Sequence, residues 1–507
     1  MAPMTGPALP TVWVLGDQLS RTHGPLADFA PGGCRVLLVE SSALLHGRRW
    51  HRQRLHLVLS AMRHFAEELR DEGFDVDHRR ADTLAVGLAA HRADHVPTRV
   101  VAARPFSIDG LRRLAALDVE TVAHDFFLTG PEEFAEWAQG RNRLRMEDFY
   151  RWQRRRLDVL MDGDEPAGGE WNHDHDNRER PPRDGRSWPA ISRFEPDDID
   201  RAVSADLDTD PGVECWGDRP EGLWPVSRRQ AIVRLGEFLD HGLAPFGPHE
   251  DAMLSAEWKL AHSVLASSLN LGLLHPDEVV RAAEARYREG GVPINSVEGF
   301  VRQVIGWREY VWCRYWYGGE EYRMRNMLGA DRPVPPAFTG ESTTEMACVA
   351  ATVAGLRERA YGHHIQRLMV LGNLALTAGV EPWAMSEWMR VTFVDGAEWV
   401  MVPNVIGMAL HADGGEMATK PYASGGAYLN RMSDYCRDCR FDPAKRTGDD
   451  ACPFTSLYWD FLARNEEALA TNHRMARQLA GMRRLGDLGE VRERAVAVRA
   501  RLECGDL

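Results

Sequence analysis

The sequence has few cysteines and no long run of apolar residues. Its 507 residues include 8 cysteines, too few for a fold that depends on disulfides. No stretch of about 18 consecutive apolar residues is present that could cross a membrane, and no segment has the pattern of a secretory signal peptide. We therefore expect a cytoplasmic protein that functions without a membrane.

The sequence also lacks the two common glycine-rich phosphate-binding motifs. The first apolar run continues into "LGDQLS", which does not have the glycine spacing of a dinucleotide-binding turn, and no P-loop occurs. The net charge of −14 gives no overall attraction to nucleic acid. Any DNA-binding surface must therefore be a local basic face on an acidic chain.

Apolar runs alternate with helical patterns in the first part of the chain. The runs cover residues 11–15, 35–39, 74–78 and 99–103, and residues 55–69 between them carry apolar side chains three or four apart. This alternation is typical of a parallel sheet whose strands are joined by crossover helices. We therefore predict an α/β domain over residues 1–130.

The rest of the chain divides into a polar part and a helical part. Residues 131–225 are rich in proline, glycine and charge, which is typical of a long connector packed over a surface. After residue 225 apolar residues recur three or four apart, as in "SVEGFVRQVIGWREYVWCRYW". We predict a large all-α domain over residues 226–507, without an internal repeat.

Three cysteines lie close together in "MSDYCRDCRFDPAKRTGDDACPF". Cys436 and Cys439 form a CxxC turn, and Cys452 follows after twelve intervening residues with Pro453 behind it. Three thiolates with this spacing can bind one face of a metal centre. The spacing suits structural zinc or an iron–sulfur cluster, and the Cys–Pro ending favours the cluster. Three unrelated free thiols are the least favoured interpretation.

The fourth ligand must come from elsewhere in the fold. We choose Cys348, because it begins a helical stretch that leads to "GHHIQR" and would tie the centre to those histidines. The candidates are Cys34, Cys215, Cys313, Cys348 and Cys504.

Longer motifs occur in order across nearly the whole chain. They are "GDQLS", "SAMRHFAEEL", "LRMEDFYR", "NSVEGFVRQVIGWREY", "GHHIQRLMVLGN", "EWVMVPNVIGM", "ADGG", "KPY" and "NRMSDYC". Together they resemble the iron–sulfur bacterial cryptochromes and (6-4) photolyases, a branch of the cryptochrome/photolyase superfamily. The resemblance implies a Rossmann-like antenna domain with a parallel five-stranded sheet, a long linker, and a helical domain that holds FAD. It also implies a 4Fe–4S cluster bound by Cys348, Cys436, Cys439 and Cys452.

An FAD site needs hydrogen-bond donors for the pyrophosphate and flat apolar walls with a few polar contacts for the isoalloxazine. The segment "HSVLASSLN" supplies His262, Ser263 and Ser267, and "RQVIGWREY" supplies Arg302, Gln303 and Arg308. Without the resemblance, each would be interpreted as an ordinary core or helix-surface residue. The resemblance assigns further cofactor contacts to Trp307, Arg367, Asp395, Met401 and Asn404.

The resemblance also implies the repair chemistry. Breaking a (6-4) pyrimidine–pyrimidone lesion requires an electron from excited reduced flavin and a proton, which a histidine can supply near neutral pH. His364 matches the family's active-site histidine, and His363 is its neighbour. Tyr422 and Tyr428 match tyrosines near the lesion pocket, where a flipped base pair would enter. The expected partner is UV-damaged DNA, double- or single-stranded, bound by a monomer.

The sequence departs from the family at residues that concern electron supply. Met401 stands where this branch usually has an acid, and a thioether cannot receive a hydrogen bond from flavin N5 as a carboxylate would. Phe338 stands where the family usually has tryptophan, Met389 where it has tyrosine and Ala397 where it has an aromatic residue. Trp388 is kept as an electron-transfer residue. We expect photoreduction to be slow or rerouted.

The antenna site is expected to bind 6,7-dimethyl-8-ribityllumazine. "LGDQLS", Glu40 and "SAMRHF" match the family, while "ARPFSIDGL" replaces a usual stretch. For the whole protein the prediction is light-driven repair of (6-4) photoproducts. The alternatives are a cryptochrome-like blue-light photoreceptor that keeps FAD and the cluster, and a structural iron–sulfur DNA-binding protein.

Overall fold

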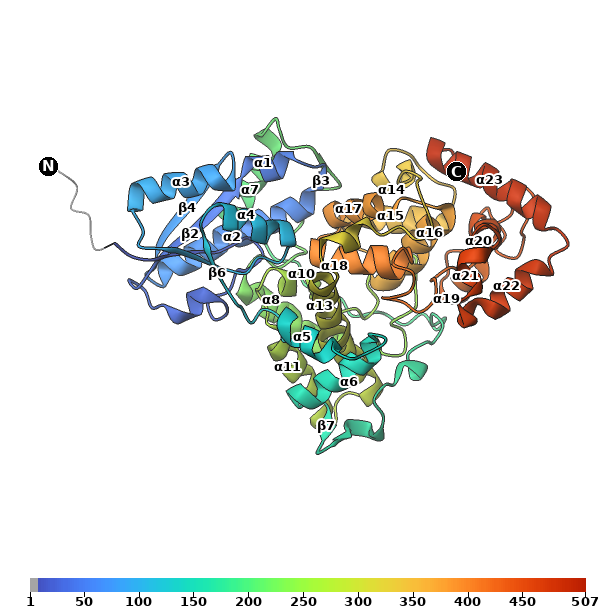
Figure 1. Cartoon of the computed structure of the whole chain (residues 1–507), viewed down its shortest axis with the longest axis horizontal. Coiled ribbons are helices and arrows are strands. Elements are labelled where there is room, and N and C mark those ends of the chain that lie inside the picture. The colour runs from blue at the N-terminus through green and yellow to red at the C-terminus, as the bar shows by residue number, and fades with distance from the viewer. Residues whose placement is uncertain (1–7) are drawn as a thin grey trace. The chain divides into compact units, whose positions relative to one another are not determined.

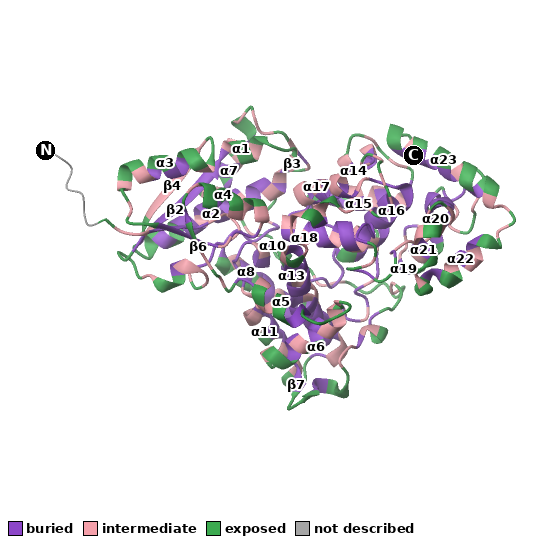
Figure 2. Ribbon diagram, viewed as in Figure 1, coloured by how far each residue is buried: buried purple, intermediate pink, exposed green. Residues whose placement is uncertain are grey.

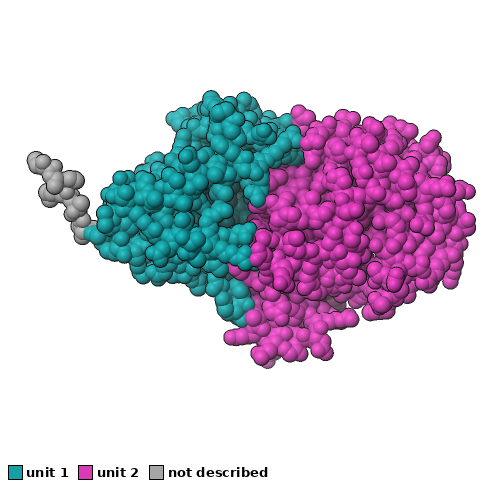
Figure 3. All heavy atoms as spheres, turned by 45° about the horizontal axis from the view of Figure 1, so that its top comes forward, with its two compact units in different colours: residues 1–133, 191–237, 263–282 teal, residues 134–190, 238–262, 283–507 magenta. Residues whose placement is uncertain are grey.

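A computed structural model of the protein describes residues 8–507, and the chain divides into two compact units (Figure 3). Unit 1 consists of the chain up to Glu133 with Ile191–Glu237 and Ser263–Ala282. Unit 2 consists of Phe134–Ala190, Phe238–His262 and Ala283–Leu507. Each unit is thus assembled from separate segments, whereas the predicted domain boundaries cut the chain into consecutive stretches; those boundaries stay a prediction.

Unit 1 contains the predicted parallel sheet, which has five strands in the order β4-β2-β1-β5-β6 (Figure 1). All four pairings are parallel, as in Thr11 opposite Arg35 and Val101 opposite Glu120. The apolar runs in the sequence did not mark the fifth strand, β6, because its side chains are exposed or only partly buried. The strands are β1 Thr11–Trp13, β2 Arg35–Ser41, β4 Asp75–Ala81, β5 Val100–Ala103 and β6 Glu120–Val122.

Helices cover both faces of this sheet, because side chains of a strand point alternately to opposite faces. Val39 of β2 packs in one core with Leu88 of α3 (Leu84–His95) and Leu114 of α4 (Ile108–Ala116). The next residue, Glu40, points the other way and binds Arg63 of α2 (Arg52–Asp71). The same helix, α2, also packs against α7 (Asp198–Thr209), which lies within the predicted connector.

Unit 2 is helical, as predicted for the C-terminal part of the chain (Figure 1). Buried residues, purple in Figure 2, run through α13, and α16 is buried at every position. No helix among the described residues is long and apolar enough to cross a membrane. The main helices are α6 Met146–Leu157, α12 Ile294–Val301, α13 Glu309–Gly318, α15 Ala347–Arg359, α16 Asn373–Ala378, α17 Pro382–Thr392, α18 Glu398–Met401, α19 Gly426–Met432, α20 Pro453–Arg464, α22 Ala476–Arg483 and α23 Leu488–Cys504.

Four stretches of unit 2 widen into π-helical turns. They are η4 (Phe238–Gly242), η5 (Arg302–Arg308), between α12 and α13, η7 (Gln366–Gly372), before α16, and η8 (Val402–Ala409), after α18. π-helical turns are rare and occur frequently at functional sites. Most of the predicted cofactor residues of unit 2 lie on or beside them.

Candidate functional site

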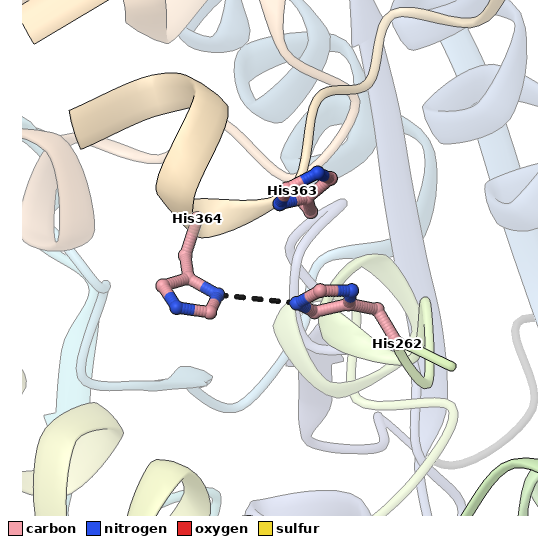
Figure 4. Close-up of side chains that lie close together, drawn as sticks. All are labelled: His262, His363 and His364. Carbon is pink, nitrogen blue, oxygen red and sulfur yellow. Dashed lines mark hydrogen bonds between the residues drawn. The ribbon is translucent and has the colours of Figure 1, made fainter. Parts of the chain in front are cut away.

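Three histidines meet in unit 2: His262, His363 and His364 (Figure 4). The chain turns sharply after α15 at Ala360, which has the positive φ of 53°, and this turn brings the histidine pair round before η7. His262 Nε2 lies 3.3 Å from His364 Nδ1, and the rings of His262 and His363 stack with centroids 4.6 Å apart. One nitrogen of each lies within 4.8 Å of the others, a spacing that a divalent metal ion could also bridge.

The three histidines differ in exposure and in charge. Burial lowers the pKa of His262 to about 3, and the nearby His364 adds to this. Burial also holds the pKa of His363 well below its usual range, so both imidazoles are neutral near pH 7. The side chain of His364 is 44% exposed and its Nε2 lies 3.3 Å from Asp251 Oδ1. His364 is therefore the member of the cluster that can exchange a proton with a bound molecule.

Asp251 is the partner that sequence reasoning missed. Burial alone would raise its pKa, but the hydrogen bond to His364 and the charge of His364 lower the pKa of Asp251 overall. Its ionised carboxylate is thus available to stabilise a protonated imidazole. Asp251 lies in an irregular loop 113 residues before His364, where no periodic pattern marks it.

Tyr422 and Tyr428 lie in the same electrostatic surroundings. Burial raises the pKa of both phenols, and the charge of Asp251 raises each of them further. Both side chains are only partly buried. The guanidinium of Arg431 lies 5.5 Å from the ring centre of Tyr428, and the charge of Arg178 acts on both tyrosines. The structure therefore brings the predicted tyrosines into one region with Asp251 and His364.

Gln303 and Trp307 form the accessible part of an otherwise buried helix, and Arg308 lies beside Trp307 at its edge. Gln303 and Trp307 are partly exposed and the side chain of Arg308 is 9% exposed, whereas Val304, Ile305 and Gly306 between them are buried. The guanidinium of Arg308 donates to Glu309 at 2.8 Å and lies 5.5 Å from the ring centre of Trp399. A polar and aromatic face on a buried π-helical turn suits a cofactor that is itself largely enclosed.

Arg302 from the same turn has acidic partners. It lies 3.2 Å from Glu298, 3.4 Å from Asp174 and 3.7 Å from Glu250. Burial raises the pKa of Glu250 to about 7 despite the charge of Arg302. The guanidinium of Arg302 is thus surrounded by carboxylates. An FAD phosphate would have to displace these carboxylates to accept hydrogen bonds from Arg302.

Arg367 and Asp395 form a bidentate pair. Arg367 Nη1 lies 3.0 Å from Asp395 Oδ1, and Nη2 donates to Oδ2 at 3.1 Å. Arg367 also lies 4.2 Å from the ring centre of Phe393, which helps to hold its plane. Shortly after Asp395 in the sequence, Met401 is buried and the side chain of Asn404 donates to the carbonyl of Val400 at 2.9 Å.

Two predicted phosphate ligands fall in unit 1. Ser263 accepts a bond from the backbone N–H of Leu265 at 3.5 Å. Ser267, in α10 (Ala266–Asn270), is buried, and its hydroxyl makes no hydrogen bond within the described part of the chain.

Cys348, Cys436, Cys439 and Cys452 are close enough in space to influence one another. Burial raises the pKa of Cys348 well above its usual range, and the other three thiols raise it further. Burial and two of these neighbours likewise raise the pKa of Cys436 to about 12. Four buried or half-buried thiols that raise one another's pKa form a donor set that a metal centre could hold in the deprotonated form. A Cβ on Gly426 would lie 2.9 Å from Cys452 Sγ, so this close approach needs glycine.

Glu40 of unit 1 lies beside an open pocket of about 470 Å³. Arg63 donates two 2.8 Å hydrogen bonds to its carboxylate, and His78 Nε2 lies 2.9 Å away. Burial would raise the pKa of Glu40, but these two partners lower it to about 2. The pocket is lined by Arg63, Glu67, His78, Arg80, Asp198, Ile199 and Ala202. The binding of a ribityllumazine there stays a prediction.

Comparisons with known proteins cover nearly the whole chain. A family model described as deoxyribodipyrimidine photo-lyase-related protein matches residues 12–219. A (6-4) photolyase of Agrobacterium fabrum is 42% identical over 490 residues, which cover 94% of this chain and 96% of the relative. The uncharacterized protein R855 of Acanthamoeba polyphaga mimivirus is 29% identical over 97 residues, 19% of this chain and 72% of that protein. The crystal structure of a bacterial class III photolyase from Agrobacterium tumefaciens shares the fold, with a TM-score of 0.55 and 17% identity over 99% of both chains.

Proposed function

Because this chain belongs to the (6-4) photolyase family, we propose that it repairs (6-4) pyrimidine–pyrimidone photoproducts in DNA by light-driven electron transfer, with His364 as the proton donor. Bound FAD in its reduced form would supply the excited electron. The accessible face of Gln303 and Trp307 supports a flavin site, as do the neighbouring Arg308, the Arg367–Asp395 pair and Asn404.

The observation that carries the proposal is the environment of His364. Its Nε2 faces the carboxylate of Asp251, and its Nδ1 faces the neutral His262. Asp251 stabilises the protonated imidazole, whereas His262 and His363, kept neutral by burial, do not compete for the role of acid. His364 can therefore hold a proton, donate it to the lesion as the hydroxyl returns to its original base, and recover it afterwards.

Tyr422 and Tyr428 complete the proposed lesion site. Their raised pKa values keep both phenols protonated, so each can donate a hydrogen bond to a flipped base. Their partly exposed rings also offer flat surfaces on which a base can stack.

The decisive experiment is illumination of the chemically reduced protein with an oligonucleotide that contains one (6-4) lesion. Chromatography should show restored thymines that are absent from a dark control. If the flavin remains photoactive but no thymine is restored, the protein is instead a blue-light photoreceptor. Met401 favours this second candidate, because a buried thioether at the position that the family pattern places beside flavin N5 would give that atom no acidic partner.

Replacing Met401 by glutamate should lengthen the lifetime of the reduced flavin in air. A hydrogen bond to a charged group is worth about 1.5–3 kcal/mol, so the gain should be about tenfold or more. The lifetime can be followed by flavin absorption after illumination. Met401→Leu is the matched control, since it keeps the site apolar and should stay within about twofold of wild type. Equal lifetimes in all three proteins would show that residue 401 does not contact the flavin.

DNA affinity should weaken steeply with salt although the chain is acidic overall. Arg431 and Arg178 provide local positive charge beside the two tyrosines, so phosphates are expected to bind there. In a titration of log Kd against log salt, Arg431→Gln should reduce the slope by about 1. Arg288→Gln is the matched control, because Arg288 already pairs with Asp162 and Glu284. A slope that Arg431→Gln leaves unchanged would place the phosphates elsewhere.

A further inference from the structure

A line of three tryptophans in unit 2 is not used by the proposed repair chemistry. Trp312 and Trp316 are four residues apart on α13, which places them on one helix face with ring centres 5.5 Å apart. Trp399 of α18 lies across from them, with its ring centre 5.9 Å from that of Trp312. These separations are those of aromatic rings in direct contact.

The three rings run from the interior of unit 2 towards its surface. Trp399 and Trp312 are 2% and 1% exposed, whereas Trp316 is only partly buried. The inner end lies among the predicted flavin residues, because Arg308 contacts the ring of Trp399, and Met401 follows two residues later in the same helix. The outer end can be reached by small molecules in solution.

The tryptophan kept from the family pattern has a different environment. The ring of Trp388 contacts Phe338 at 5.3 Å and Phe393 at 6.3 Å, measured between ring centres. Met389 follows it on α17. Phenylalanine is far harder to oxidise than tryptophan, so within the described residues neither ring in contact with Trp388 can pass an electron to it.

We propose that Trp399, Trp312 and Trp316 form the route by which electrons reach the flavin in light; this rests on the proposed function, since it requires bound FAD. Trp399 would give one electron to bound, light-excited oxidised FAD, Trp312 would then give one electron to Trp399, and Trp316 would give one to Trp312. A small thiol in solution then gives one electron to the partly exposed ring of oxidised Trp316 and releases its own proton to water, and two of the resulting thiyl radicals join as a disulfide. Each photon thus moves one electron from thiol to flavin.

The test compares tryptophan variants that retain FAD, as checked by flavin absorption before illumination. Under blue light with a thiol reductant, Trp312→Phe should slow flavin photoreduction about tenfold or more. Transient absorption should then show no long-lived tryptophan radical. Trp316→Phe is a second variant at the surface, where folding is least at risk, and should also remove that radical. Trp459→Phe is the matched control, because Trp459 is a partly exposed tryptophan of unit 2 outside the line.

Each outcome has a distinct meaning. The proposal is overturned if both Trp312→Phe and Trp316→Phe are photoreduced at the wild-type rate. It is also overturned if Trp388→Phe loses photoreduction completely while the radical signal of the three tryptophans remains. After chemical reduction, Trp312→Phe should repair lesions like wild type, since electron supply is then bypassed. If wild type photoreduces through the line but repairs nothing after chemical reduction, the proposed function is wrong while the route stands.

Discussion

His364→Ala should bind FAD and lesion DNA as wild type does, yet lose repair of (6-4) lesions by about 10²–10⁴-fold. The substitution removes the one accessible histidine of the cluster and leaves the buried His262 and His363 in place. A group that acts mainly in the transition state affects turnover much more than binding. The amount of restored thymine after single-turnover illumination measures repair, and a titration with lesion DNA measures binding.

Two further variants make this result specific. Asp251→Asn should lower repair less than His364→Ala does, because the imidazole remains but its protonated form loses a carboxylate partner. His473→Ala, at an exposed position in unit 2, should repair like wild type. If His364→Ala restores thymines as fast as wild type, the histidine only lines the pocket and the proposed mechanism is wrong.

Cys436→Ser should lose iron and leave unit 2 unfolded or insoluble. The four cysteines lie at the start of α15, in the turn after α19 and at the residue before α20, so a metal centre bound by them would hold three separate segments together. A structural metal centre can contribute about 10 kcal/mol or more, which is comparable with the ~5–15 kcal/mol stability of a domain. Iron and zinc analysis per chain, with thermal unfolding, measures the effect.

Cys313→Ala is the matched control, because Cys313 is a buried cysteine of α13 outside the group of four. It should keep the iron and cost only about 1 kcal/mol of packing. One zinc and no iron in the wild-type protein would refute the iron–sulfur cluster. Iron lost from Cys313→Ala but kept in Cys348→Ser would show that the fourth ligand was wrongly chosen.

Local patterns in the sequence were sufficient for the architecture. Alternating apolar runs and helical periods predicted the parallel sheet, because a strand buried on both faces must be apolar throughout, as Val36–Val39 of β2 is. The same reasoning missed β6, whose half-exposed residues carry no such signal. The CxxC turn and Cys452 were also visible locally, since metal ligands on short loops need fixed spacings.

The contacts that give the candidate site its chemistry join residues that are far apart in the sequence. Asp251 meets His364 across 113 residues, Arg302 lies among carboxylates from three segments, and Trp399 meets Trp312 between two helices. None of these pairs belongs to a repeating local pattern, because each partner is set by how distant elements pack. The sequence by itself therefore determined the fold class, the helical part and the residue types available for the chemistry. Only the tertiary structure decided which histidine has a carboxylate partner and which tryptophans are in contact, since burial and proximity arise only when the chain is folded.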